Sequence, residues 1–135
     1  MSHYLEIKTK ITNRASLVKA LCKCGFKENQ IELHDTPTNL YGYTGDKRNQ
    51  TANVIIRRQD VGASSNDLGF VQKEDGTYEA IISEFDQRKY NEKWLNKVGT
   101  EHGIENAKNA FTMNGWDYTE SVDNQGRTQL LGTSY

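Results

Sequence analysis

The sequence has 135 residues, of which 35% are hydrophobic and 26% charged, a size and polarity typical of one globular domain with its own core. Seventeen basic and 18 acidic side chains leave a net charge of −1, which gives no overall field to attract nucleic acid or an anionic membrane. The mean hydropathy of −0.83 argues against a membrane span, and a start without an apolar segment argues against a secretory signal. We therefore expect a cytoplasmic protein.

The first elements alternate between strand and helix. Residues 4–11 place apolar and charged side chains in strict alternation, which predicts a half-buried strand. Residues 12–25 predict a helix, with Thr12 or Asn13 as the N-cap and Gly25 just past its end. A short strand over 30–35 is expected to stop before Pro37.

The middle of the chain predicts three further strands. Residues 40–51 read as a loop or distorted strand, and 52–59 read as an interior strand that is apolar on both faces. Residues 68–83 predict a hairpin that turns at Asp75-Gly76, because that turn needs the positive φ that glycine adopts freely.

The last third predicts a helix followed by a hairpin. Residues 86–115 have helical periodicity, with Gly99 and Gly103 as positions where the helix could break and Asn114-Gly115 as its end. Residues 116–131 predict a hairpin that turns at 124–126. The order β-α-β-β-β-β-α-β-β indicates a single α+β domain over 1–135, with a mostly antiparallel sheet and about two helices on one face.

Side chains typical of metal or nucleophilic catalysis are sparse. Cys22 and Cys24 point to opposite sides of a helix, so they cannot share a ligand, and we expect reduced thiols and no metal or cofactor. His34 and His102 lie at predicted element ends. Glu84 and Asp86 admit a catalytic carboxylate pair, although charge at a helix N-terminus is the commoner reason for such residues.

Two adjacent arginines follow the interior strand. Strand alternation puts Arg58 on the side of Val54 and Ile56, so one arginine must lie near the core edge and needs a carboxylate or carbonyl partner. The nearest candidate partners in the sequence are Asp46, Asp60 and Asp67. Two alternatives stay open, a structural ion pair that pins the following loop and an anion site built from Arg58 and loop amides.

Two short segments carry the remaining candidate binding residues. Residues 62–69 lack the glycine spacing and the Lys-Ser/Thr of a phosphate-binding loop, and Asn66 and Asp67 suit local turns. Tyr41 and Tyr43 stand near Lys47 and Arg48, a mixture that can stack on unpaired bases, but the neutral net charge makes nucleic acid an unfavoured partner.

Five motifs in order resemble a known family. They are MSH at the start, LYGYTGD at 40–46, VIIRRQ at 54–59, SSNDLGF at 64–70 and WLN at 94–96. They resemble a conserved hypothetical protein of red-algal plastids and cyanobacteria, one of the ycf reading frames and a domain-of-unknown-function family. The likeness covers a core of about 1–103 and does not extend to 104–135. It implies an accessory protein of the cytoplasm or plastid stroma, with relatives in other bacteria and their phages, and it carries no catalytic residue.

The leading hypothesis is a non-enzymatic accessory, assembly or regulatory protein that binds a protein partner through a polar face formed by 41–46 and 57–69. The candidate binding residues are Tyr41, Gly42, Tyr43, Asp46, Arg57, Arg58, Asn66, Asp67 and Gly69. In this hypothesis Arg58 and Asp67 order the face. The alternatives are a small enzyme or sensor that holds an anion through Arg58, and binding of RNA or single-stranded DNA. The oligomeric state stays open.

Overall fold

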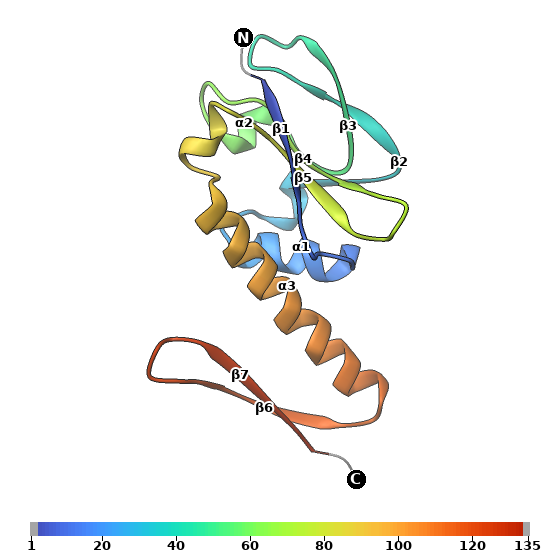
Figure 1. Ribbon diagram of the computed structural model, residues 1–135, viewed down its shortest axis with the longest axis vertical. Helices are drawn as coiled ribbons and strands as arrows, with labels where there is room; N and C mark the ends of the chain where they lie inside the picture. Colours follow the sequence, from blue (N-terminus) through green and yellow to red (C-terminus); the bar gives the residue numbers. More distant parts are fainter. Residues whose placement is uncertain (1–2, 134–135) are drawn as a thin grey trace.

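The computed structural model describes residues 3–133, which form a five-stranded antiparallel sheet, a separate two-stranded sheet and two long helices (Figure 1). The strands are β1 (Tyr4–Lys8), β2 (Ile31–Tyr41), β3 (Lys47–Ile56), β4 (Leu68–Gln72), β5 (Tyr78–Ser83), β6 (Asp117–Val122) and β7 (Thr128–Thr133). The helices are α1 (Arg14–Lys23), α2 (Arg58–Val61) and α3 (Glu92–Met113), with short 3-10 turns η1 (Glu28–Gln30) and η2 (Asp86–Arg88). This single domain confirms the predicted α+β class and the predicted order of its main elements.

The large sheet has the strand order β1-β5-β4-β3-β2, with every neighbouring pair antiparallel. The first strand therefore lies at one edge, beside the last strand of the sheet, and α1 is the connection that carries the chain across to β2 at the other edge. Gly76 has φ +88°, as the predicted hairpin turn between β4 and β5 requires.

Helices α1 and α3 cover one face of the sheet, as predicted. Leu17 and Leu21 of α1 and Val98 of α3 are completely buried there against Val54 and Phe70 of the sheet. The N-cap of α1 is Asn13, whose side chain accepts a hydrogen bond from Ser16 N at 2.9 Å.

The other face has its own small core of Tyr4, Leu40, Ala52, Ile55 and Ile81. This cluster joins β1 and β2, which are the opposite edges of the sheet, so the β2–β3 hairpin must bend over this face. Glycine is required at one point of the bend, because a Cβ on Gly69 would lie 2.6 Å from the Ala52 Cβ and 3.1 Å from a Leu40 methyl.

Strand β2 continues through Pro37 and ends at Tyr41, so the expected stop before Pro37 is wrong. The pairing of β2 with β3 shifts register between Leu33 and Thr38, and a bulge of this kind accommodates a residue that cannot donate to the ladder. The buried Asn53 amide donates to the carbonyls of His34 and Asp35 at 3.1 and 3.3 Å. Residues 40–51, expected to be a loop or a distorted strand, are the end of β2, a tight turn and the start of β3, whose pairing is irregular here.

Helix α3 runs unbroken past Gly99 and Gly103, the two positions where the sequence allowed a break. Buried Leu95, Val98 and His102 recur at helical spacing and anchor it to the core, which outweighs the glycine penalty of about 1 kcal/mol per residue. The helix ends at Asn114-Gly115, as predicted. No helix within residues 3–133 is long and apolar enough to cross a membrane.

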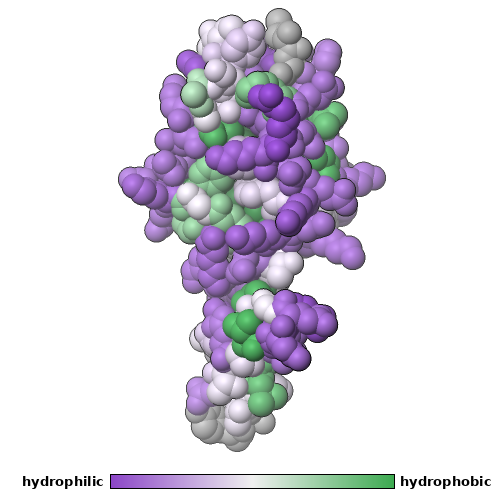
Figure 2. Space-filling model, turned by 90° about the vertical axis from the view of Figure 1, so that its left-hand side faces the viewer, coloured by the Kyte–Doolittle hydropathy of each residue, from purple (hydrophilic) through white to green (hydrophobic). Residues whose placement is uncertain are grey.

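The predicted C-terminal hairpin is present as β6 and β7, and its turn contains Gly126 at φ +78°. It packs on the end of α3, where the Phe111 ring stacks on Trp116 and Tyr118 with centroids 6.0 and 5.9 Å apart. The hairpin projects away from the large sheet as a narrow arm with hydrophobic side chains on its surface (Figures 1 and 2).

Candidate functional site

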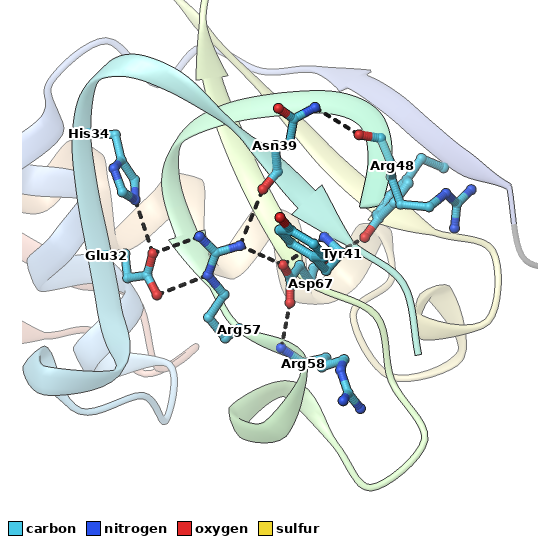
Figure 3. A network of polar contacts seen from close by, with 9 residues as sticks. Glu32, His34, Asn39, Tyr41, Arg48, Arg57, Arg58 and Asp67 are labelled. Carbon is cyan, nitrogen blue, oxygen red and sulfur yellow. Dashed lines mark hydrogen bonds and ion pairs between the residues drawn. The ribbon is translucent and has the colours of Figure 1, made fainter. Parts of the chain in front are cut away.

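Three segments that are distant in the sequence meet at one end of the sheet. They are the turn after β2, the junction between β3 and α2, and residues 65–67 just before β4 (Figure 3). Together with Tyr41 at the end of β2 and Gly69 in β4, these segments hold the candidate binding residues, so the structure does bring 41–46 together with 57–69.

Asp67 is the centre of this region. Its side chain is only 1% exposed and accepts hydrogen bonds from three donors. Oδ2 accepts from Tyr41 N at 2.8 Å and from Arg57 Nη1 at 2.7 Å, while Oδ1 accepts from Arg58 N at 2.7 Å. The backbone of Asp67 adds a bond from its N–H to Tyr41 O and accepts one from the Tyr4 hydroxyl at 2.6 Å. One buried carboxylate thus ties the turn after β2 to the start of α2.

Arg57, not Arg58, is the arginine that pairs with carboxylates. Its guanidinium lies between Asp67 and Glu32, and two nitrogens donate to the two Glu32 oxygens, each at 2.9 Å (Figure 3). The hydrogen bonds to Glu32 and then to Asp67 raise the pKa of Arg57. The same contact lowers the pKa of Glu32, whose carboxylate also meets the His34 ring at 3.0 Å.

Strand alternation had placed Arg58 on the side of Val54 and Ile56, and this placement failed because β3 ends at Ile56. Strand alternation therefore no longer governs Arg58, and Arg57 follows Ile55 on the face opposite the helices. The other two candidate partners lie elsewhere: Asp46 accepts from the Thr44 hydroxyl at 2.6 Å, and Asp60 accepts from Gln30 at 3.3 Å.

Arg58 is half-buried and contributes in two ways. Its backbone N–H is held by Asp67, and its guanidinium donates to the carbonyl of Tyr43 at 3.2 Å. That contact is exposed, as are the side chains of Tyr41 and Tyr43, while the guanidinium that lies over the Tyr41 ring, 5.8 Å from its centroid, is that of Arg57.

Asn66 forms a second buried link. It is completely buried, accepts from Tyr43 N at 2.9 Å and donates to the Ser83 hydroxyl at 2.9 Å. Asp86 in η2 accepts from Asn66 N at 3.0 Å and from the Ser83 hydroxyl at 2.8 Å. This fixes the Tyr43 backbone to β5 and places Asp86 in a structural hydrogen-bond network.

The two remaining candidate residues are glycines that permit close approach. A Cβ on Gly42 would collide with the carboxylate of Asp46, which closes the turn, and Gly69 makes room for Leu40 as described above. Gly42 and Gly69 are buried, as are Asn66 and Asp67, so these four position the surface and do not form it.

Sequence reasoning missed Glu32, Tyr4, Ser83 and Asp86 as partners. Each bonds to residues of the region that are 17 to 63 positions away in the sequence, and no local motif predicts such a contact.

The Tyr4 hydroxyl remains protonated and acts as a donor. Burial raises its pKa, and the charge of Asp67 raises it further.

Within residues 3–133, no three His, Cys, Asp or Glu side chains are grouped in a way that could hold a metal ion. Cys22 and Cys24 are free thiols, and burial raises the pKa of both.

Comparison with known proteins identifies the family. Residues 25–131 match the model of DUF1257, described as a protein of unknown function, and the chain belongs to that family. The match includes residues 104–131, which the resemblance described above did not cover. No curated protein and no solved structure matches the chain.

Proposed function

We propose that this member of the DUF1257 family is a non-enzymatic binding protein that serves assembly or regulation. Its recognition surface is formed by Tyr41, Tyr43 and Arg58, called here the tyrosine–arginine face. The observation that carries the proposal is that two buried side chains, Asp67 and Asn66, hold the backbone N–H groups of all three residues. Burying a carboxylate or an amide destabilises the fold unless its hydrogen bonds are made. Here the hydrogen bonds of both groups hold surface residues in place.

This arrangement suits binding because the surface is already ordered before a partner arrives. Tyr41 is 38% and Tyr43 46% exposed, although each backbone is held by a short hydrogen bond at 2.8 or 2.9 Å. Rigid tyrosine and arginine side chains contribute strongly to protein interfaces, and prior ordering lowers the entropy cost of association. A protein partner that offers a carboxylate to Arg58 and an apolar surface to the rings would fit.

The polar groups of this region are less suited to acid–base catalysis. Both Asp67 oxygens already accept hydrogen bonds, and Arg57 is matched by two carboxylates, so these groups are engaged within the fold. Arg58 forms no ion pair with another residue in 3–133, and its hydrogen bond to the Tyr43 carbonyl is exposed, which is why an anionic small ligand is the second candidate. We place the protein in the cytoplasm or plastid stroma, in line with the ycf-type resemblance.

The proposal is tested by affinity capture from a nuclease-treated lysate of the native organism. The double variant Tyr43→Ala with Arg58→Ala removes exposed groups without touching Asp67 or Asn66. The control is Phe85→Ala with Arg88→Ala, an exposed aromatic–arginine pair elsewhere on the surface, with the guanidinium 4.0 Å from the ring centroid. We expect the first pair to lower capture of a specific protein at least roughly tenfold and the control to leave it unchanged.

Two outcomes would contradict the proposal. Equal loss of the partner with both double variants would move the interface away from the tyrosine–arginine face. No protein captured, together with a melting temperature raised by millimolar phosphate or citrate in the wild type but not in Arg58→Ala, would instead support an anion-binding protein.

A further inference from the structure

A groove of about 1040 Å³ lies between β1 and α3, away from the tyrosine–arginine face. Leu5 and Ile7 of β1 form one side, and Leu95, Gly99 and Gly103 of α3 form the other. Leu5 is 41% exposed although it lies on the helix-covered side of the sheet, because α3 stands off from it.

The strand at this groove has an open edge. Among residues 3–133, β1 pairs only with β5. Glu84 N donates to His3 O at 2.8 Å, which shows which residues of β1 bond to β5. In an antiparallel pair every second residue points its N–H and C=O to the neighbour, so Leu5 and Ile7 face β5. The backbone groups of Glu6 and Lys8 then point outward, where a further strand would find them.

The helix wall of the groove is kept bare by glycine. Gly99 and Gly103 are one turn apart, both line the groove, and an added Cβ at either would meet nothing within 4 Å. Each glycine costs the helix about 1 kcal/mol relative to alanine. Internal packing does not require either glycine. We therefore infer that glycine at these positions serves to keep the groove open.

Charge indicates what the groove would bind. Lys8 and Lys10 line one part of the groove and Glu92 lines another, and neither lysine forms an ion pair with another residue in 3–133, although the charge of Asp75 acts on Lys8. Two lysines against one carboxylate favour an acidic ligand.

From these four observations we propose that the groove binds an extended acidic peptide segment of a partner protein, which adds beside β1 as a sixth strand. The peptide backbone bonds to the outward N–H and C=O groups of Glu6 and Lys8. Alternate side chains lie over Gly99 and Gly103, and a peptide carboxylate meets Lys8 and Lys10. This site is separate from the tyrosine–arginine face and does not depend on it.

The test uses the full chain and a phage-displayed library of random octapeptides as the probe. Gly103→Leu fills the groove, and it should also raise the helix propensity, so the variant stays folded. Ala110→Leu is the matched control, because it adds the same side chain to an exposed position of α3 outside the groove.

We expect acidic peptides with alternating apolar residues to be selected. Their affinity should fall more than tenfold in Gly103→Leu and in Lys8→Glu with Lys10→Glu, but not in Ala110→Leu or in Tyr43→Ala with Arg58→Ala. Hydrogen exchange at the amides of Glu6 and Lys8 should slow when peptide is bound.

Three results would overturn the proposal. One is that no acidic peptide is selected, and another is that the selected peptides bind wild type and Gly103→Leu equally. The third is a wild-type dimer in sedimentation that Gly103→Leu converts to a monomer, because the groove would then hold a second copy of the chain, for instance through its C-terminal arm.

Discussion

Replacing Asp67 by asparagine should loosen the junction on which the tyrosine–arginine face depends. The substitution keeps the shape of the side chain but turns one acceptor oxygen into an NH₂ donor. The better orientation keeps oxygen at the Oδ2 position, for Tyr41 N and Arg57, and leaves the buried NH₂ opposite the Arg58 N–H.

The magnitude follows from what is lost and what is retained. Breaking a buried ion pair from one side costs about 3 to 5 kcal/mol. Arg57 keeps both hydrogen bonds to Glu32, so its charge remains paired. The lower end of that range therefore applies. We expect a loss of about 3 kcal/mol in the free energy of unfolding and a fall of about 10 °C in the melting temperature.

Urea unfolding followed by tryptophan fluorescence measures this loss, since Trp94 packs against the Tyr90 ring at 5.0 Å in the core. Asp60→Asn is the control, because Asp60 is an exposed carboxylate in α2 whose removal should change stability by less than about 0.5 kcal/mol. If Asp67→Asn loses less than about 1 kcal/mol, or no more than the control, the carboxylate does not hold this junction.

Three further results are expected. Gly69→Ala should lose about 2 kcal/mol in urea unfolding, because its Cβ has no room, whereas Gly99→Ala should gain up to about 1 kcal/mol; the same sign for both would contradict the packing described. His102 is buried and accepts from two backbone N–H groups at the start of α1, and burial lowers its pKa. The unfolded chain therefore takes up that proton first, and stability should fall as the pH drops below about 6.5, with a flatter profile in His102→Gln. Backbone amides of the C-terminal arm should exchange faster in hydrogen-exchange mass spectrometry than those of β4 and β5, since a two-stranded sheet on its own is marginally stable; equal protection would refute this.

Local sequence patterns predicted those elements for which the local preference of the residues matches the structure they adopt in the fold. The alternation in β1, the Asn13 cap of α1 and the Asp75-Gly76 turn each carry their own signal, and each is found where it was expected. The continuity of α3 was not predictable in this way. Its glycines weaken the helix locally, and only the burial of Val98 and His102 against the rest of the fold compensates.

The sequence predicted which segments form the candidate site, but not which hydrogen bonds and ion pairs join them. The motifs around Tyr41, Arg57 and Asp67 do converge, whereas the choice of Arg57 as the paired arginine depends on where β3 ends. Glu32 can bond to Arg57 because β2 lies beside β3 and Glu32 pairs with Ile55. The register of this pairing shifts beyond Leu33. Such long-range pairings are set by the whole sheet and leave no mark in a short stretch of sequence.

The most direct test of the proposed function is hydroxyl-radical footprinting of the protein, purified and in native lysate, with oxidation of Tyr41 and Tyr43 compared against Tyr118 in the arm. We predict that both tyrosines of the face are oxidised several-fold less in the lysate while Tyr118 is unchanged. Equal oxidation of all three in the two samples would contradict a recognition surface at the tyrosine–arginine face.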